Sequence, residues 1–313
     1  MLDDFVAWLA TTPGSIALHE SLYIYAIVET THVVAITLFV GTIAMIDLRV
    51  LGLALNRVPV SQVLRRLLPW TMLGFLILIV TGALLFYAIP ERTFHSLWFR
   101  AKVLLLVLAG LNAWRFHRAY GVSPVGWDMG PAPARARLSA IASLALWVGV
   151  IFFGRFIAYN WFDCDKPQPA FISAAIRESL WLFPVIEAVH LVGLAILGGA
   201  LFVVDLRLMG GGLTRQSIAE VEQGARAWFL GALALMLSTG ALLGMSEAVK
   251  LYDRPAFFLK MITLTLGLLL VFTVRRSLIA RNPRGGPFAF AVGALSVCLW
   301  LTTAVAGRWI GFS

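Results

Sequence analysis

Two glutamate–histidine pairs stand inside long apolar stretches and are the residues best able to do chemistry. Glu29 and His32 are three residues apart, as are Glu187 and His190. At this spacing both side chains lie on one face of a helix. A neutral imidazole can bind haem iron, and imidazole with carboxylate can bind non-haem iron or copper. In a third, structural interpretation, each histidine hydrogen-bonds to its glutamate or to a neighbouring helix.

The composition requires elements that cross a membrane. Of 313 residues, 60% are hydrophobic and 13% are charged, whereas a soluble domain is about half apolar and a quarter charged. The net charge of +9 resides largely in short loops, which indicates positive-inside topology rather than nucleic-acid binding. The only cysteines, Cys164 and Cys298, form no motif. We expect an all-α polytopic membrane protein.

Eight apolar runs have the length of about 20 residues that a membrane-spanning helix needs. Residues 1–12 are too short and acidic for a signal peptide and predict a helix on the membrane surface, with Phe5, Trp8 and Leu9 on one face. The predicted spans are residues 22–46, 67–89, 97–116, 138–159, 180–204, 227–246, 256–274 and 287–310.

The chain contains an internal duplication. Residues 20–102 overlay residues 178–260 at a constant offset of 158, with 22 identities in 83 positions. The identities include polar residues, which apolar composition alone would not keep in register. We therefore predict two tandem four-helix repeats, residues 1–160 and 161–313. Because each has an even number of spans, they are related by a pseudo-two-fold axis along the membrane normal, and His32 and His190 lie at equal depth.

Duplicated cations lie near the outer ends of the spans. Lys102 and Lys260 stand early in their spans, and Arg155 and Arg308 stand late in theirs. They would lie about one haem radius outward of the histidines, where haem propionates could bond to them. Alternatively, each long side chain reaches to the membrane interface. The duplicated Thr-Gly step at residues 81–82 and 239–240 predicts close helix packing, or close approach of a flat macrocycle.

These motifs resemble two bacterial membrane families. A span-1 histidine, a Thr-Gly step and a span-3 lysine within four spans are similar to the CopD-type copper-resistance family. They also resemble the HemJ-type protoporphyrinogen oxidase family, in which the histidine and lysine carry function and haem b is bound. The closing residues Ala306–Phe312 (AGRWIGF) resemble those of uncharacterised bacterial integral membrane proteins. The resemblance implies haem binding at His32 and His190. Glu29, Glu187 and the duplication depart from the HemJ pattern.

Together these features predict a b-type haem protein of the bacterial inner membrane. We expect electron transfer with quinone or a redox protein as partner, and membrane-bound oxidoreductase activity stays open. The cofactor residues would be His32, His190, Lys102, Lys260, Arg155 and Arg308. The alternative is a CopD-like permease or metal-binding protein, in which His32, His190, Glu29 and Glu187 hold copper or non-haem iron.

The charge pattern predicts the orientation. Arginine-rich loops follow spans 1, 3 and 7, so these loops should face the cytoplasm and both termini the periplasm. Reporter fusions at residues 60, 125 and 280 should give cytoplasmic signals. A periplasmic signal at any two of them would contradict this orientation.

Overall fold

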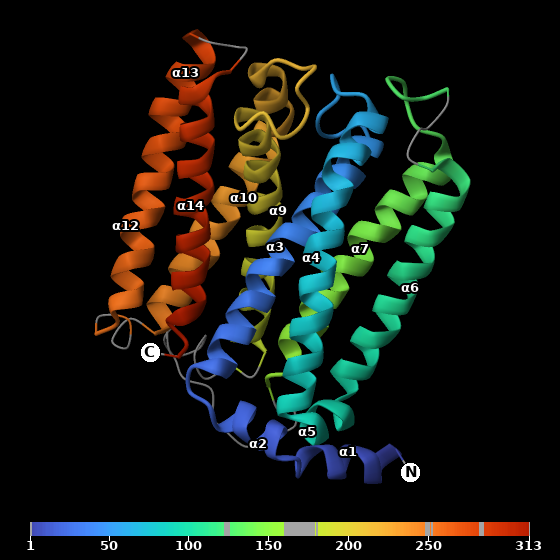
Figure 1. Cartoon of the computed structure of the whole chain (residues 1–313), viewed down its shortest axis with the longest axis vertical. Coiled ribbons are helices and arrows are strands. Elements are labelled where there is room, and N and C mark those ends of the chain that lie inside the picture. The colour runs from blue at the N-terminus through green and yellow to red at the C-terminus, as the bar shows by residue number, and fades with distance from the viewer. Residues whose placement is uncertain are drawn as a thin grey trace.

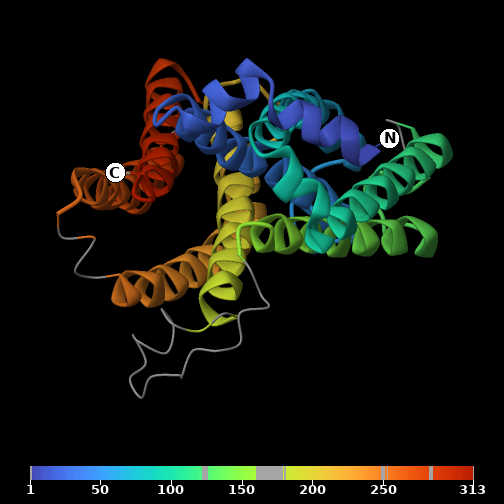
Figure 2. The same ribbon diagram turned by 90° about the horizontal axis from the view of Figure 1, so that it is seen from below.

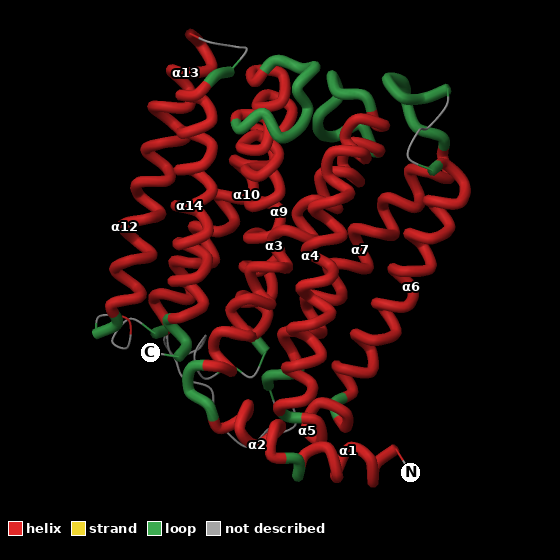
Figure 3. The backbone as a smooth tube through the Cα atoms, in the orientation of Figure 1, coloured by secondary structure: helices red, strands yellow, loops and turns green. Residues whose placement is uncertain are grey.

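The structure is a computed structural model that describes residues 2–121, 126–159, 179, 181–247, 251, 253–281 and 285–312. Within these residues the protein is helical, no strand occurs, and eight helices are long and apolar enough to span a membrane (Figure 3). The all-α membrane architecture is therefore confirmed. The eight are α3 (Ile24–Val50), α4 (Val60–Ala88), α6 (Leu97–Tyr120), α7 (Ala134–Phe156), α9 (Leu182–Leu208), α10 (Ile218–Ser246), the continuous run α12–η1–α13 (Pro255–Leu269, Leu270–Arg275, Arg276–Arg281) and α14 (Pro287–Trp309).

Each predicted span coincides with one of these helices, but many helices continue beyond the apolar run at the end that carries the arginines. The largest differences are in α4 and α10, which begin at Val60 and Ile218 rather than at residues 67 and 227. Backbone hydrogen bonds continue wherever the local sequence tolerates a helix, whether or not the side chains are apolar. Hydropathy therefore marks the buried part of a helix and not its ends.

A helix is present where a surface helix is predicted. It is α1 (Leu2–Ala10), and the structure adds α2 (Pro13–Glu20) directly after it. Phe5 and Trp8 are exposed on α1, whereas Val6 is buried. α1 packs against the short helix α5 (Pro90–His95) and lies across one end of the long helices (Figure 1).

The helices are arranged around a central pair, α3 and α9 (Figures 1 and 2). α4 packs on α3, and α10 packs on α9. α7 contacts both central helices, and so does α14, while α6 packs on α7 and α12 packs on α14. Both termini lie at the same end of the molecule (Figure 1). Each packing pair in the first half thus has an equivalent in the second.

Glycines allow the two central helices to touch backbone to backbone. A Cβ added to Gly41 would lie 2.5 Å from the carbonyl oxygen of Ala195 and 2.8 Å from the amide nitrogen of Gly199. A Cβ added to Gly199 would collide with the backbone of Gly41. Close approach at small residues is a usual source of helix association in membranes. Gly41 and Gly199 are equivalent positions of the duplication, so the contact is self-complementary.

An arginine orders the connecting loop in each half. The Nε of Arg49 donates to the carbonyl of Val58 (2.6 Å), and the Nε of Arg207 donates to the carbonyl of Gln216 (2.8 Å). The four residues are equivalent in pairs, so the two loops are built alike. Each loop also holds a buried leucine with positive φ: Leu55 (51°) and Leu213 (52°).

Enlarging a glycine at the central crossing should destabilise the protein. We expect Gly199→Ala to lower the free energy of unfolding by about 1–3 kcal/mol, because the added methyl group has no space. The control is Gly231→Ala in α10, where an added Cβ would have no neighbour within 4 Å. Thermal unfolding in detergent measures both, and equal midpoints for the two variants would contradict the assigned role of the crossing.

Candidate functional site

Each histidine is held by the Thr-Gly step of the neighbouring helix. The Nδ1 of His32 on α3 lies 2.8 Å from the Oγ1 of Thr81 on α4. The next residue, Gly82, is so close that an added Cβ would lie 3.4 Å from the Cε1 of His32. The second half repeats the arrangement with His190, Thr239 and Gly240, at the same 2.8 Å and 3.4 Å.

The threonine favours one of the two histidine nitrogens as the carrier of the proton. Thr81 donates its single hydroxyl proton to the carbonyl oxygen of Ile77, at 2.7 Å. With that proton used, Oγ1 is an acceptor for His32, which favours the tautomer that carries its proton on Nδ1. The lone pair of the neutral ring then lies on Nε2, one of the two nitrogens through which histidine binds metals. Thr239 donates likewise to the carbonyl of Leu235, at 2.6 Å, which favours the same tautomer of His190.

A lysine lies near each histidine. Lys102 is close enough to His32, and Lys260 to His190, for the charges to interact. Both lysines are half-buried, and neither makes a hydrogen bond or ion pair with another residue of the described ranges. The duplicated glycines give them room, since a Cβ added to Gly154 would lie 3.5 Å from the Nζ of Lys102. Among the described residues, each half thus holds a lysine without an acidic partner near its histidine.

The two intramembrane glutamates pair with arginines of the opposite half. Arg308 on α14 forms an ion pair with Glu29 on α3. Arg155 on α7 forms the equivalent pair with Glu187 on α9, with its Nε at 2.7 Å from the carboxylate. Tyr159 also donates its hydroxyl to Glu187. The carboxylates are therefore neutralised across the interface between the halves.

The histidine contacts are those of the structural interpretation, a hydrogen bond to a neighbouring helix. In the described part of the chain, Glu29 and Glu187 make no hydrogen bond to the histidines, whereas Thr81 and Thr239 do. The sequence predicts only close packing, or the approach of a macrocycle, for the Thr-Gly steps. Among the described residues, no group of three His, Cys, Asp or Glu side chains is placed to hold a metal ion. The duplication in register was the sequence signal that could have indicated both threonines.

Comparison with known proteins gives a family without an assigned activity. A model described as a family of unknown function, DUF6644, matches residues 5–160 and 182–313. The chain belongs to the DUF6644 family. Residues 1–4 and 161–181 lie outside the match. No curated protein and no solved structure matches the chain, so the resemblance to the CopD-type and HemJ-type families stays a prediction.

The cross-half ion pairs can be tested by a double-mutant cycle on this family member. Arg155→Gln and Glu187→Gln should each lower the free energy of unfolding by about 2 kcal/mol, because each leaves a half-buried charge without its partner. The double variant should lose less than the sum of the two single losses. Thermal unfolding measures all three, and strictly additive losses would show that the pair has no coupling.

Proposed function

We propose that the protein binds b-type haem through the Nε2 atoms of His32 and His190 and transfers electrons in the membrane. The carrying observation is the duplicated contact between each histidine Nδ1 and a threonine hydroxyl of the neighbouring helix, at 2.8 Å in both halves. A metal-bound histidine commonly donates its other ring N–H to such a partner, which sets its orientation and basicity. Two half-buried imidazoles that are already set in this way fit iron ligation better than a purely structural role.

The surrounding residues have distinct roles in this proposal. When bound, haem would supply one-electron chemistry at its iron. Gly82 and Gly240 place no side chain against the imidazole rings, and an added Cβ would lie 3.4 Å from each Cε1. Lys102 and Lys260 supply positive charge for the propionates. Arg155 and Arg308 were also expected to hold propionates, but the glutamates already neutralise them, so we assign that role to the lysines alone.

The proposed setting is the bacterial inner membrane, with both termini in the periplasm. The two termini share one end of the molecule (Figure 1), and arginine-rich loops lie at the other, as the positive-inside rule requires. A lipid-soluble quinone or a redox protein is the proposed electron partner. Redox turnover of a quinone would make the protein a membrane-bound oxidoreductase.

The described side chains favour haem over the copper-permease alternative. Copper or non-haem iron would need several protein ligands at one point, and the described residues hold no group of three such ligands. Haem needs only an axial imidazole from the protein, since its own four nitrogens bind the iron. One histidine in each half is therefore sufficient for haem and insufficient for a bare metal ion.

An absorption spectrum of the purified protein tests the proposal. We expect a Soret band that His32→Ala and His190→Ala each remove or shift, because each substitution deletes a ligand. His95→Ala is the matched control, since this histidine is exposed on the short helix α5. A wild-type protein that contains copper and shows no Soret band would favour the permease instead.

The threonine variants sharpen the same test. Thr81→Val removes the acceptor of Nδ1–H and should weaken haem binding by about 10- to 100-fold, the usual effect of losing such a partner. Thr81→Ser keeps the hydroxyl and should retain haem. Equal haem content in the two variants would contradict the assigned role of the threonine.

A further inference from the structure

The long helix that follows α10 contains a π-helical segment. η1 (Leu270–Arg275) lies between α12 and α13. The equivalent helix in the first half, α6, is α-helical throughout. π-Helical turns are rare and frequently occur at functional sites. η1 belongs to the second half alone among the described residues, so the duplicated histidine site does not explain it.

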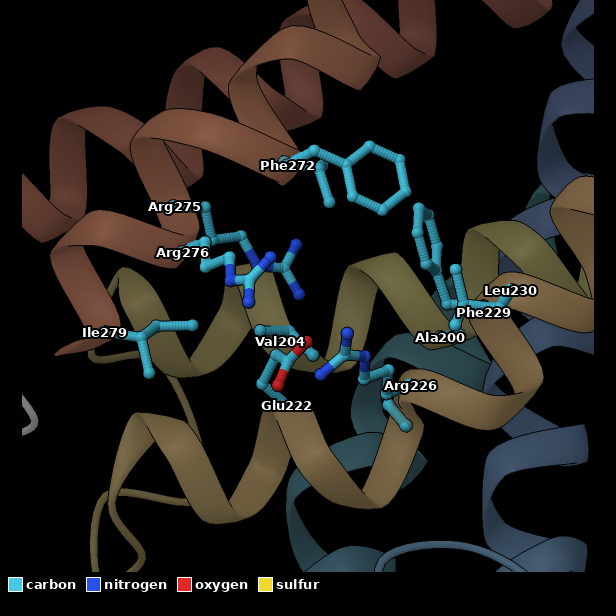
Figure 4. Close-up of a pocket in the computed structure, with 12 residues that line it drawn as sticks. Ala200, Val204, Glu222, Arg226, Phe229, Leu230, Phe272, Arg275, Arg276 and Ile279 are labelled. Atoms are coloured by element: carbon cyan, nitrogen blue, oxygen red, sulfur yellow. The ribbon is translucent and has the colours of Figure 1, made fainter.

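A pocket of about 80 Å³ lies between η1, α13, α9 and α10. One water needs only about 15 Å³, so the pocket can hold a small polar group. Figure 4 shows Arg275 and Arg276 entering this space from one side, and Arg226 and Glu222 from the other. The rest of the wall is largely apolar and includes Phe229, Leu230 and Phe272.

Arg275 has unused donors although it is buried. Its side chain is 6% exposed, and its Nη1 lies 3.4 Å from the Oδ1 of Asp205. Ser296 donates to the other carboxylate oxygen of Asp205, at 2.8 Å. The buried Nε of Arg275 has no hydrogen-bond partner among the described residues. A guanidinium has five N–H donors, and leaving them unpaired in a buried place is costly.

Three of the four charged residues of the pocket have no equivalent charge in the first half, whereas Arg276 aligns with Arg118. The positions equivalent to Glu222, Arg226 and Arg275 are Leu64, Leu68 and His117. Arg226 and Arg276 are exposed at the pocket, and neither makes an ion pair or hydrogen bond with another described residue. The pocket thus has three arginines but only two nearby carboxylates, Glu222 and Asp205. Asp205 already binds Ser296 and Arg275. The excess positive charge calls for an anionic ligand.

We propose that this pocket binds the phosphate group of an anionic phospholipid. Guanidinium groups bind phosphate oxygens in a bidentate way. The pocket lies at the end of the molecule that carries the arginine-rich loops, and basic pockets between helices there are suited to lipid headgroups. Phe272 and Leu230 are 44% and 40% exposed, so acyl chains can run along them. Glu222 disfavours a dianionic free phosphate more than a monoanionic phosphodiester.

The test uses the full-length protein in nanodiscs of phosphatidylcholine, with or without phosphatidylglycerol. We expect phosphatidylglycerol to raise the unfolding midpoint and to remain bound in native mass spectrometry. The double variant Arg226→Gln/Arg276→Gln should weaken that retention about tenfold, because charge-assisted hydrogen bonds are lost. Arg275 is left intact, since its removal would leave Asp205 buried without a cation.

The control is Arg115→Gln/Arg118→Gln on α6, which removes the same charge from two exposed arginines at the same end of the molecule. Retention unchanged in the control and reduced in the pocket variant supports the site. Equal loss in both variants would overturn it, because general attraction at the interface would then suffice. Inorganic phosphate added to phosphatidylcholine nanodiscs is the second arm, and stabilisation equal to that by phosphatidylglycerol would overturn the lipid as the source of the phosphate group.

Discussion

The backbone contact between Gly41 and Gly199 is the constraint on which the rest of the structure depends. It brings α3 and α9 so close that neither position can carry a side chain. Because the two glycines are equivalent positions of a duplicated chain, this one contact relates the two halves to each other. α7 and α14 can then each touch both central helices. The arrangement follows from packing, since lipid supplies no hydrophobic drive between helices.

The polar side chains near the crossing fall into two sets: those that pair with one another and those without a partner among the described residues. α7 and α14 carry Arg155 and Arg308 to the glutamates of the opposite half. Removing charges from water is costly unless they are paired, and these four residues satisfy that requirement among themselves. The histidine Nε2 atoms and the lysine ammonium groups have no such partner in the described ranges. A ligand with a metal centre and anionic substituents would satisfy both, and that is why haem is the proposed occupant.

The histidine sites of the two halves are alike, whereas the helix that contains η1 differs from its equivalent, α6. The histidine, threonine and lysine arrangement occurs twice with the same geometry. The π-helix, by contrast, occurs only in the second half of the described chain, where Arg275 replaces the equivalent His117. A duplicated site indicates a function that both halves perform. A site confined to one half indicates a contact that distinguishes them, such as a bound lipid.

The eight spans and the internal duplication follow from the amino-acid sequence alone, because hydropathy and the register of identical residues need no coordinates. The ends of the helices do not, since backbone hydrogen bonding continues past the apolar run. Which side chains form ion pairs and hydrogen bonds across helices depends on the tertiary packing. Register shows that arginines and glutamates recur together, but not that Arg308 reaches Glu29 from the other half. Thr81 is 49 residues from His32, and its role as acceptor depends on how α4 packs on α3. The π-helix could not be predicted from the sequence either. An apolar run has the same hydropathy whether its backbone forms α-helical or π-helical hydrogen bonds.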